Sequence, residues 1–182
     1  MPLSNGMNPA QFSSNRARKI LVVDDNPEVR RAVVRVLCPT RPPSTLASIE
    51  ADLFESSPPS PVSSSAPFDV TCASQGAEGF EIMRRELAMG VPFAAAIVDM
   101  RMPPGWTGVE TIERMLEVQP ELEVAICSAY SDFSWHEVIR RVKRPSLRLL
   151  HKPFTAGELV ELTWSLVERA DRHHSYNPRA AP

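Results

Sequence analysis

The sequence predicts an α/β protein in which five parallel strands form one sheet with helices on both faces. Short apolar runs, typical of strands buried on both sides, alternate along the chain with stretches in which apolar residues recur every three or four positions. This alternation favours a parallel sheet, because neighbouring parallel strands are joined by crossovers that usually contain a helix. A hydrophobic content of 43% and a charged content of 23%, over 182 residues, allow a globular domain with a core.

The first strand and helix form the first of these units. Residues 19–23 contain an apolar, β-branched run that ends at the adjacent carboxylates Asp24 and Asp25. Asn26 can cap a following helix, and Pro27 suits its first turn. The apolar residues after them stand at helical spacing: Val29, Val33, Val36 and Leu37.

The chain changes character between this helix and the second strand. Residues 39–67 hold seven of the 18 prolines, eight serines and no glycine, a composition that buries too little apolar surface to pack. We interpret them as a Pro/Ser-rich surface insertion with one short amphipathic helix, carried by Leu46, Ile49, Leu53 and Phe54. Residues 1–17 are interpreted as a flexible leader, residues 18–170 as the domain and residues 171–182 as a polar tail.

Four further strand–helix units follow the insertion. Residues 68–72 and 94–98 are the second and third strands, and Asp99 stands at the end of the third. Residues 124–127 and 147–150 are the fourth and fifth strands, which end at Ser128 and at His151-Lys152-Pro153. The helices are marked by apolar residues at helical spacing: Phe80, Met83 and Leu87, ending near Gly90; Val109, Ile112 and Leu116, after a loop with Gly105 and Gly108; Trp135, Val138, Ile139 and Val142; and Leu159, Leu162 and Leu166.

The charge and the cysteines narrow the classes of function. A formal net charge of −2 provides no basic surplus for nucleic acid or for an anionic membrane. Cys38, Cys72 and Cys127 are widely spaced, which argues against a disulfide or a zinc site and fits a cytosolic protein. No apolar segment approaches the length of a membrane helix. We therefore expect a cytoplasmic protein with no direct nucleic-acid or membrane partner.

Polar residues gather where the predicted strands end, namely Asp24, Asp25, Asp99, Ser128 and Lys152. The carboxyl ends of parallel strands share one edge of the sheet, where such folds bind ligands. Two carboxylates about 4 Å apart repel each other by about 4 kcal/mol at an effective dielectric constant near 20. A hard divalent cation relieves this repulsion, and Mg²⁺ in particular binds both carboxylate and phosphate oxygens. The strand ends therefore predict a Mg²⁺ site that accepts a phosphoryl group.

Within this cluster Asp99 is the candidate nucleophile, because carboxylates form aspartyl-phosphate intermediates. Lys152 can place a positive charge against the phosphate, and the Ser128 hydroxyl can donate a hydrogen bond to it. The metal ion can bridge Asp99 and the phosphate. Phosphoryl transfer depends mostly on such positioning and charge neutralisation.

Four pieces of the sequence resemble the CheY-like receiver domains of response regulators in two-component signalling. They are Val-Val-Asp24-Asp25-Asn, Ile-Val-Asp99-Met-Arg-Met-Pro, Cys-Ser128-Ala-Tyr and His-Lys152-Pro-Phe, and they follow the family's order over residues 18–170. The resemblance implies a flavodoxin-like fold with strand order 2-1-3-4-5. The loop after Asp99 and the following Thr-Gly-Val-Glu-Thr-Ile-Glu-Arg are similar to receivers attached to hybrid histidine kinases.

The resemblance assigns roles to the acidic residues. Asp99 would accept a phosphoryl group from a sensor histidine kinase or a phosphotransfer protein. Asp25 and Asp99 would bind Mg²⁺ directly, Asp24 through water and Arg101 through its backbone carbonyl. The implied activity is signalling by conformational change, with only slow self-catalysed phosphorylation and dephosphorylation, so we do not expect an enzyme.

It also assigns the remaining strand-end residues. Ser128 would respond to the phosphoryl group and Lys152 would pair with it. The peptide bond between Lys152 and Pro153 would be cis. The change in conformation would be read on the surface around the fourth and fifth helices.

Some positions depart from the family's pattern. The switch aromatic on the last strand falls at Leu149, which has no ring; Tyr130 or Phe133 either substitutes for it or simply packs. Arg101 and Tyr130 occupy the two positions that tune the lifetime of the phosphate. Trp106, in a loop one residue longer than usual, either covers the phosphorylation site or packs on the surface.

Three other functions are weaker predictions. A Mg²⁺-dependent phosphatase on a related fold would carry a second acid two positions after the nucleophile, where this chain has Arg101. A receiver-like scaffold that works without phosphorylation would not need the full set of strand-end residues. A dinucleotide-binding domain would show a GxGxxG motif after the first strand, and this chain has none there.

Overall fold

The five apolar runs form one parallel sheet. The computed structural model describes residues 18–39, 68–129 and 134–176 of the chain. The strands are β1 (Arg18–Val23), β2 (Phe68–Ala73), β3 (Ala95–Asp99), β4 (Glu123–Ser128) and β5 (Arg148–His151). Their order across the sheet is β2-β1-β3-β4-β5, which confirms the order that the resemblance implied.

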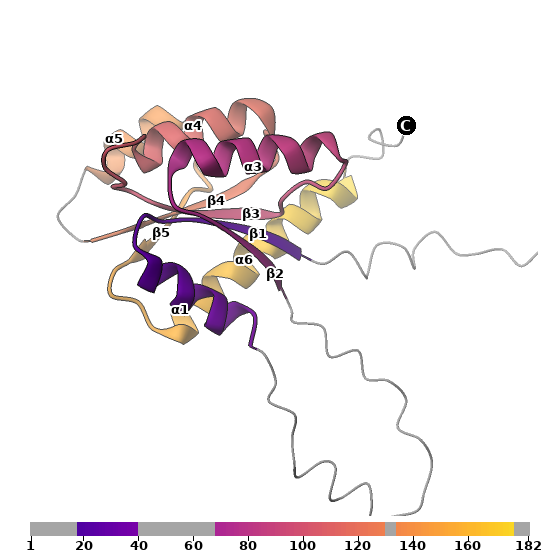
Figure 1. Cartoon of the computed structure of the whole chain (residues 1–182). Coiled ribbons are helices and arrows are strands. Elements are labelled where there is room, and N and C mark those ends of the chain that lie inside the picture. Colours follow the sequence, from indigo (N-terminus) through magenta and orange to yellow (C-terminus); the bar gives the residue numbers. More distant parts are fainter. Residues whose placement is uncertain (1–17, 40–67, 130–133, 177–182) are drawn as a thin grey trace, which may run out of the picture.

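The helices of the described residues cover both faces of this sheet. Helices α1 (Pro27–Leu37) and α6 (Ala156–Tyr176) lie on one face, and α3 (Gly76–Ala88), α4 (Gly108–Val118) and α5 (Trp135–Val142) lie on the other (Figure 1). β1 pairs with β2 on one side and with β3 on the other. The crossovers through α1 and α3 therefore run in opposite directions across the sheet. Because both are right-handed, they must lie on opposite faces.

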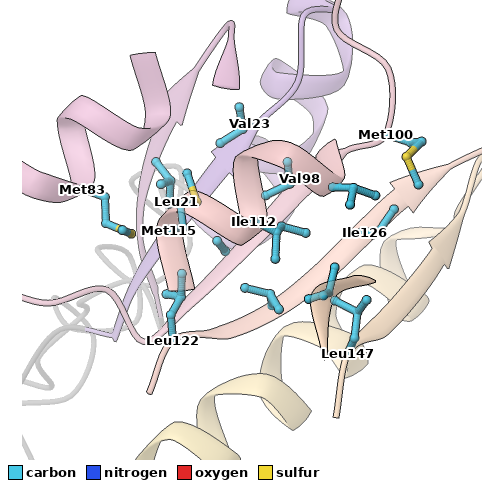
Figure 2. Close-up of a cluster of buried hydrophobic side chains, with 14 of the residues drawn as sticks. Leu21, Val23, Met83, Val98, Met100, Ile112, Met115, Leu122, Ile126 and Leu147 are labelled. Atoms are coloured by element: carbon cyan, nitrogen blue, oxygen red, sulfur yellow. The ribbon is translucent and has the colours of Figure 1, made fainter. Parts of the chain in front are cut away.

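Each face of the sheet has its own buried cluster, because successive side chains of a strand point to opposite faces. In β1, Leu21 and Val23 belong to the cluster under α3, α4 and α5, whereas Ile20 and Val22 belong to the cluster under α1 and α6. A strand that is covered on both sides has to be apolar throughout, which is why it stood out in the sequence. Figure 2 shows the first cluster, with Met83, Ile112, Met115, Val98 and Ile126.

The signals at the start of α1 and at the end of α3 act as predicted. The side chain of Asn26 accepts a hydrogen bond from the Glu28 amide at 2.9 Å, and Pro27 is the first residue of α1. Gly90, just beyond α3, has a φ of 73°, a conformation that favours glycine. Gly108, expected in the loop before α4, is instead the first residue of that helix.

The C-terminal helix is longer than expected. We predicted a polar tail from Asp171, but α6 continues to Tyr176. Its last turns contact polar residues at the edge of the sheet where the strands begin. His173 Nε2 lies 3.3 Å from the carboxylate of Glu123, and Asp171 lies 3.8 Å from Arg18. These partners are distant in sequence, so the local composition of the helix does not reveal them.

Several predicted segments lie outside the described residues: the leader at 1–17, nearly all of the insertion at 39–67, and the short helix within it. The three cysteines are free. None of the helices described here has both the length and the apolar character needed to cross a membrane.

Candidate functional site

The carboxyl ends of β1 and β3 meet where the strand order reverses. β1 and β3 are neighbours in the sheet, whereas β2 pairs with the other side of β1. In open α/β sheets this switch in order is where ligands bind. Asp24 directly follows β1 and Asp99 is the last residue of β3, and the pairing of Val23 with Val98 sets them at the same level.

Lys152, from the loop after β5, joins these two carboxylates. Its Nζ donates a hydrogen bond to Asp24 Oδ2 at 2.7 Å and another to Asp99 Oδ1 at 2.5 Å. The side chains of Asp24 and Asp99 are only 3% and 9% exposed. The structure thus brings together three of the predicted site residues in a largely buried cluster. Two carboxylates and one ammonium give this cluster a net charge of about −1 when all three are ionised.

Backbone amides hold the other oxygen of each carboxylate. The Asn26 amide donates to Asp24 Oδ1, and the Arg101 amide donates to Asp99 Oδ2, both at 2.9 Å. In each case an aspartate closes a turn on the amide two residues later. The orientation of both carboxylates is therefore determined by their own loops as well as by Lys152.

The environment raises the pKa of both Asp99 and Lys152, for different reasons. Burial raises the pKa of Asp99, and the charge of Asp24 adds to the rise, although the hydrogen bond and charge of Lys152 lower it. Burial by itself lowers the pKa of Lys152, but hydrogen bonds and attraction from Asp24 and Asp99 outweigh burial, so that pKa is raised. Lys152 therefore stays charged across the physiological range and provides a fixed positive charge beside Asp99.

Ser128 ends β4 beside this cluster. β3 pairs with β4 so that Asp99 lies opposite Cys127, and Ser128 stands one residue further along. Ser128 is 1% exposed; its hydroxyl donates to the Ala129 carbonyl at 3.2 Å, and its own carbonyl accepts from the Lys152 amide at 2.8 Å. Burial raises the pKa of the Cys127 thiol to about 12, so this neighbour stays a thiol at physiological pH.

Asp25, another predicted metal ligand, is not bonded to this cluster. It is exposed, and within the described ranges it forms no hydrogen bond or ion pair. Across the same ranges, no group of three or more His, Cys, Asp and Glu side chains converges closely enough to hold a metal ion. Asp24 and Asp99 nevertheless form a buried pair of carboxylates with a net negative charge. Such a pair fits Mg²⁺, which commonly uses one or two carboxylates and completes its shell with water.

Three of the residues that depart from the receiver pattern, Arg101, Leu149 and Trp106, lie in the described part of the chain. Arg101 is exposed, and Leu149 packs against the buried cluster under α5. Trp106 is half-buried and contacts Phe80 on α3 and Arg114 on α4. Tyr130 and Phe133 lie outside the described residues. The peptide bond between Lys152 and Pro153 is cis, as predicted, and so is the bond between Pro103 and Pro104.

Sequence reasoning missed Arg30. Its guanidinium, on α1, donates a hydrogen bond through Nη1 to the backbone carbonyl of Asp24. Arg30 stands one helical turn after the capping residue Asn26, where a long side chain can reach back to the preceding loop. The sequence signal that could have identified Arg30 was this position, in a helix that directly follows two adjacent carboxylates.

Comparison with known proteins identifies the fold. No family model and no curated protein matches the sequence. A response regulator receiver domain from Clostridium thermocellum matches with 21% identity and a TM-score of 0.59, covering 85% of this chain and 98% of that one. Chemotaxis protein CheY4 of Vibrio cholerae matches with 18% identity and a TM-score of 0.56, covering 82% and 98%. A two component transcriptional regulator AraC from Clostridium phytofermentans ISDg matches with 20% identity and a TM-score of 0.61, covering 87% and 99%. The chain has the fold of response-regulator receiver domains.

Proposed function

We propose that this protein is a phosphoacceptor receiver domain of a two-component phosphorelay and that Asp99 accepts the phosphoryl group. The observation that carries the proposal is the position of Asp99, which ends β3 at the switch in strand order with its carboxylate held by Lys152 and by the Arg101 amide. The receiver fold, found in structures that cover most of the chain, supports the same function.

The reaction is a transfer between two nucleophiles. A carboxylate oxygen of Asp99 attacks the phosphorus of a phosphohistidine on a sensor histidine kinase or a phosphotransfer protein. The P–O bond to Asp99 forms as the P–N bond breaks, and the leaving imidazole nitrogen keeps the electron pair. Lys152, already bound to Asp99, would hold its positive charge against the phosphoryl oxygens, and Ser128 would donate a hydrogen bond to one of them.

Magnesium is part of this proposal. Asp24 and Asp99 are the buried carboxylates available to it, Asp25 lies on the same loop as Asp24, and the Arg101 carbonyl would complete the protein ligands. When bound, Mg²⁺ would neutralise the negative charge of the phosphoryl oxygens. The excess of carboxylate over ammonium in the buried cluster favours such a cation.

The product would act as a signal. Water would slowly hydrolyse the acyl phosphate, and the intervening change in conformation would be read by a downstream partner on the surface around α5 and α6. Because the proposed phosphodonors are intracellular and the three cysteines are free thiols, we place the protein in the cytoplasm.

Intact mass spectrometry tests the proposal directly. The wild-type protein and the Asp99→Asn variant are incubated with acetyl phosphate, with and without Mg²⁺. We expect the wild type to gain one phosphoryl group only when Mg²⁺ is present, and the variant to gain none. Asp69→Asn, at an exposed position of β2, is the control and should be labelled like the wild type.

Two outcomes would contradict the proposal. Labelling of Asp99→Asn at the wild-type rate would show that the phosphoryl group goes elsewhere. Failure of the wild type both to be labelled and to bind Mg²⁺ would favour the scaffold that works without phosphorylation.

A further inference from the structure

The loop that follows Asp99 is tied to two helices through one aromatic side chain. This loop, residues 100–107, leads from β3 to α4. The ring of Trp106 lies 5.9 Å from the ring of Phe80 in an edge-on arrangement, and the guanidinium of Arg114 lies 4.2 Å from the centre of its face. Phe80 belongs to α3 and Arg114 to α4. The indole is therefore clamped between two helices at the side of the candidate site.

Glycines bring the loop backbone into direct contact with the start of α3. A Cβ on Gly76, the first residue of α3, would lie 3.2 Å from the Cβ of Trp106 and 2.1 Å from Thr111 Oγ1. A Cβ on Gly105 would lie 2.2 Å from Gln75 Oε1. That oxygen is buried and has no hydrogen-bond partner in the described part of the chain. The loop thus has little freedom to move toward α3 without displacing these groups.

The other end of the loop rests against Asp99 itself. A Cβ on Gly108 would lie 2.3 Å from the Asp99 carbonyl oxygen, and the Gly108 amide donates to the Met100 carbonyl at 2.9 Å. Met102, within the loop, is almost completely buried. The Gly105 amide donates to the Met102 carbonyl at 2.9 Å, so a tight turn links Trp106 to Arg101, whose amide binds Asp99.

We propose that Trp106 is a positioning residue for phosphoryl transfer to Asp99. Its ring, held by Phe80 and Arg114, keeps the loop in the arrangement in which the Arg101 amide orients the Asp99 carboxylate. This inference rests on the proposed function and extends it, because it assigns a role in the reaction to a residue that touches neither the phosphoryl group nor the proposed metal ion.

The chain contains a matched control for this role. Trp164, on α6, has the same two kinds of partner: its ring lies 4.9 Å from the ring of Phe68, and the guanidinium of Arg18 lies 4.8 Å from its centre. Phe68 and Arg18 begin β2 and β1, at the edge of the sheet opposite the candidate site. Loss of Trp164 should therefore affect stability as loss of Trp106 does, without affecting the chemistry.

The experiment compares the wild type with Trp106→Ala, Trp106→Phe and Trp164→Ala. Intact mass spectrometry follows the gain of a phosphoryl group from acetyl phosphate at several Mg²⁺ concentrations, and thermal unfolding shows that each variant is folded. A misplacement of about 1 Å can cost roughly 100-fold in rate. We expect a smaller displacement in Trp106→Ala, and therefore phosphorylation that is about tenfold slower than in the wild type. Trp106→Phe keeps an aromatic ring, so its rate of phosphorylation should lie within about twofold of the wild-type rate. The rate of Trp164→Ala should equal that of the wild type.

Wild-type rates for a folded Trp106→Ala would overturn the inference, and so would an equal loss of rate in Trp164→Ala. If Trp106→Ala does not fold, Phe80→Leu and Arg114→Gln loosen the clamp while keeping the indole, and unchanged rates in both would overturn it as well. A wild-type protein that gains no phosphoryl group would refute the proposed function itself. That result is seen without any Trp106 variant, so the two failures are distinguishable.

Discussion

Replacement of Lys152 by methionine tests how strongly one ammonium group stabilises two buried carboxylates. Methionine keeps a flexible unbranched side chain and removes the charge. Loss of one partner from a buried ion pair typically costs about 3–5 kcal/mol. The side chains of Asp24 and Asp99 are almost fully buried, but that of Lys152 is 24% exposed. Solvent therefore reduces the loss, and we expect a free energy of unfolding lower by about 3 kcal/mol at pH 7.

Urea and thermal unfolding at pH 7 and at pH 4 measure this loss. A cost of about 3 kcal/mol corresponds to a fall in Tm on the order of 10 °C for a domain of this size. The pKa of Asp99 is already raised by burial, and removal of Lys152 raises it further. As the pH falls, Asp99 takes up a proton, its repulsion with Asp24 disappears, and the difference from the wild type should shrink.

Two results would refute this reasoning. One is a Lys152→Met variant as stable as the wild type at pH 7. The other is an equal loss of stability at pH 7 and pH 4, which would point to packing rather than charge. The double variant Lys152→Met, Asp99→Asn is the control, because removal of one carboxylate should restore part of the lost stability at pH 7.

Three further predictions concern stability. Asp99→Asn should raise the free energy of unfolding at pH 7, because the pKa of Asp99 is raised in the fold and its ionisation therefore destabilises the folded state above the unfolded pKa of about 3.9. In urea unfolding this gain should vanish near pH 4, and a loss of stability at pH 7 would contradict the prediction. Gly108→Ala should cost about 3 kcal/mol in the same assay, since its Cβ would lie 2.3 Å from the Asp99 carbonyl, and a neutral result would mean that the start of α4 adjusts freely. Asn26→Ala should cost about 1 kcal/mol by removal of a cap at 2.9 Å, whereas Ser134→Ala, whose side chain makes no cap bond, should change little.

Much of the fold could be read from local patterns. A strand covered on both faces has to be apolar along its whole length, so residues 20–23 and 95–98 were recognisable without any knowledge of their neighbours. Alternation with helical periods then implied a parallel sheet, and the carboxyl ends of parallel strands share one edge. Asp24, Asp99 and Lys152 could be grouped on that basis, and the structure does join them by hydrogen bonds.

The individual contacts could not be read in the same way, because they depend on groups that are distant in sequence. Asp24 is buried against Lys152 while the adjacent Asp25 is exposed, a distinction that no property of two neighbouring aspartates reveals. The contact of Trp106 with Phe80 on α3 likewise depends on a residue that is distant in sequence.

The sequence by itself determined the fold class and the set of residues at the strand ends, because periodic burial and strand polarity act over a few residues at a time. Tertiary structure alone decided which of those residues meet, which oxygen each donor binds and how far α6 extends. The pairing of His173 with Glu123, for instance, joins the end of one helix to the start of a strand 50 residues earlier. Such contacts form only after the sheet has brought both segments together, so their energy has no local signature.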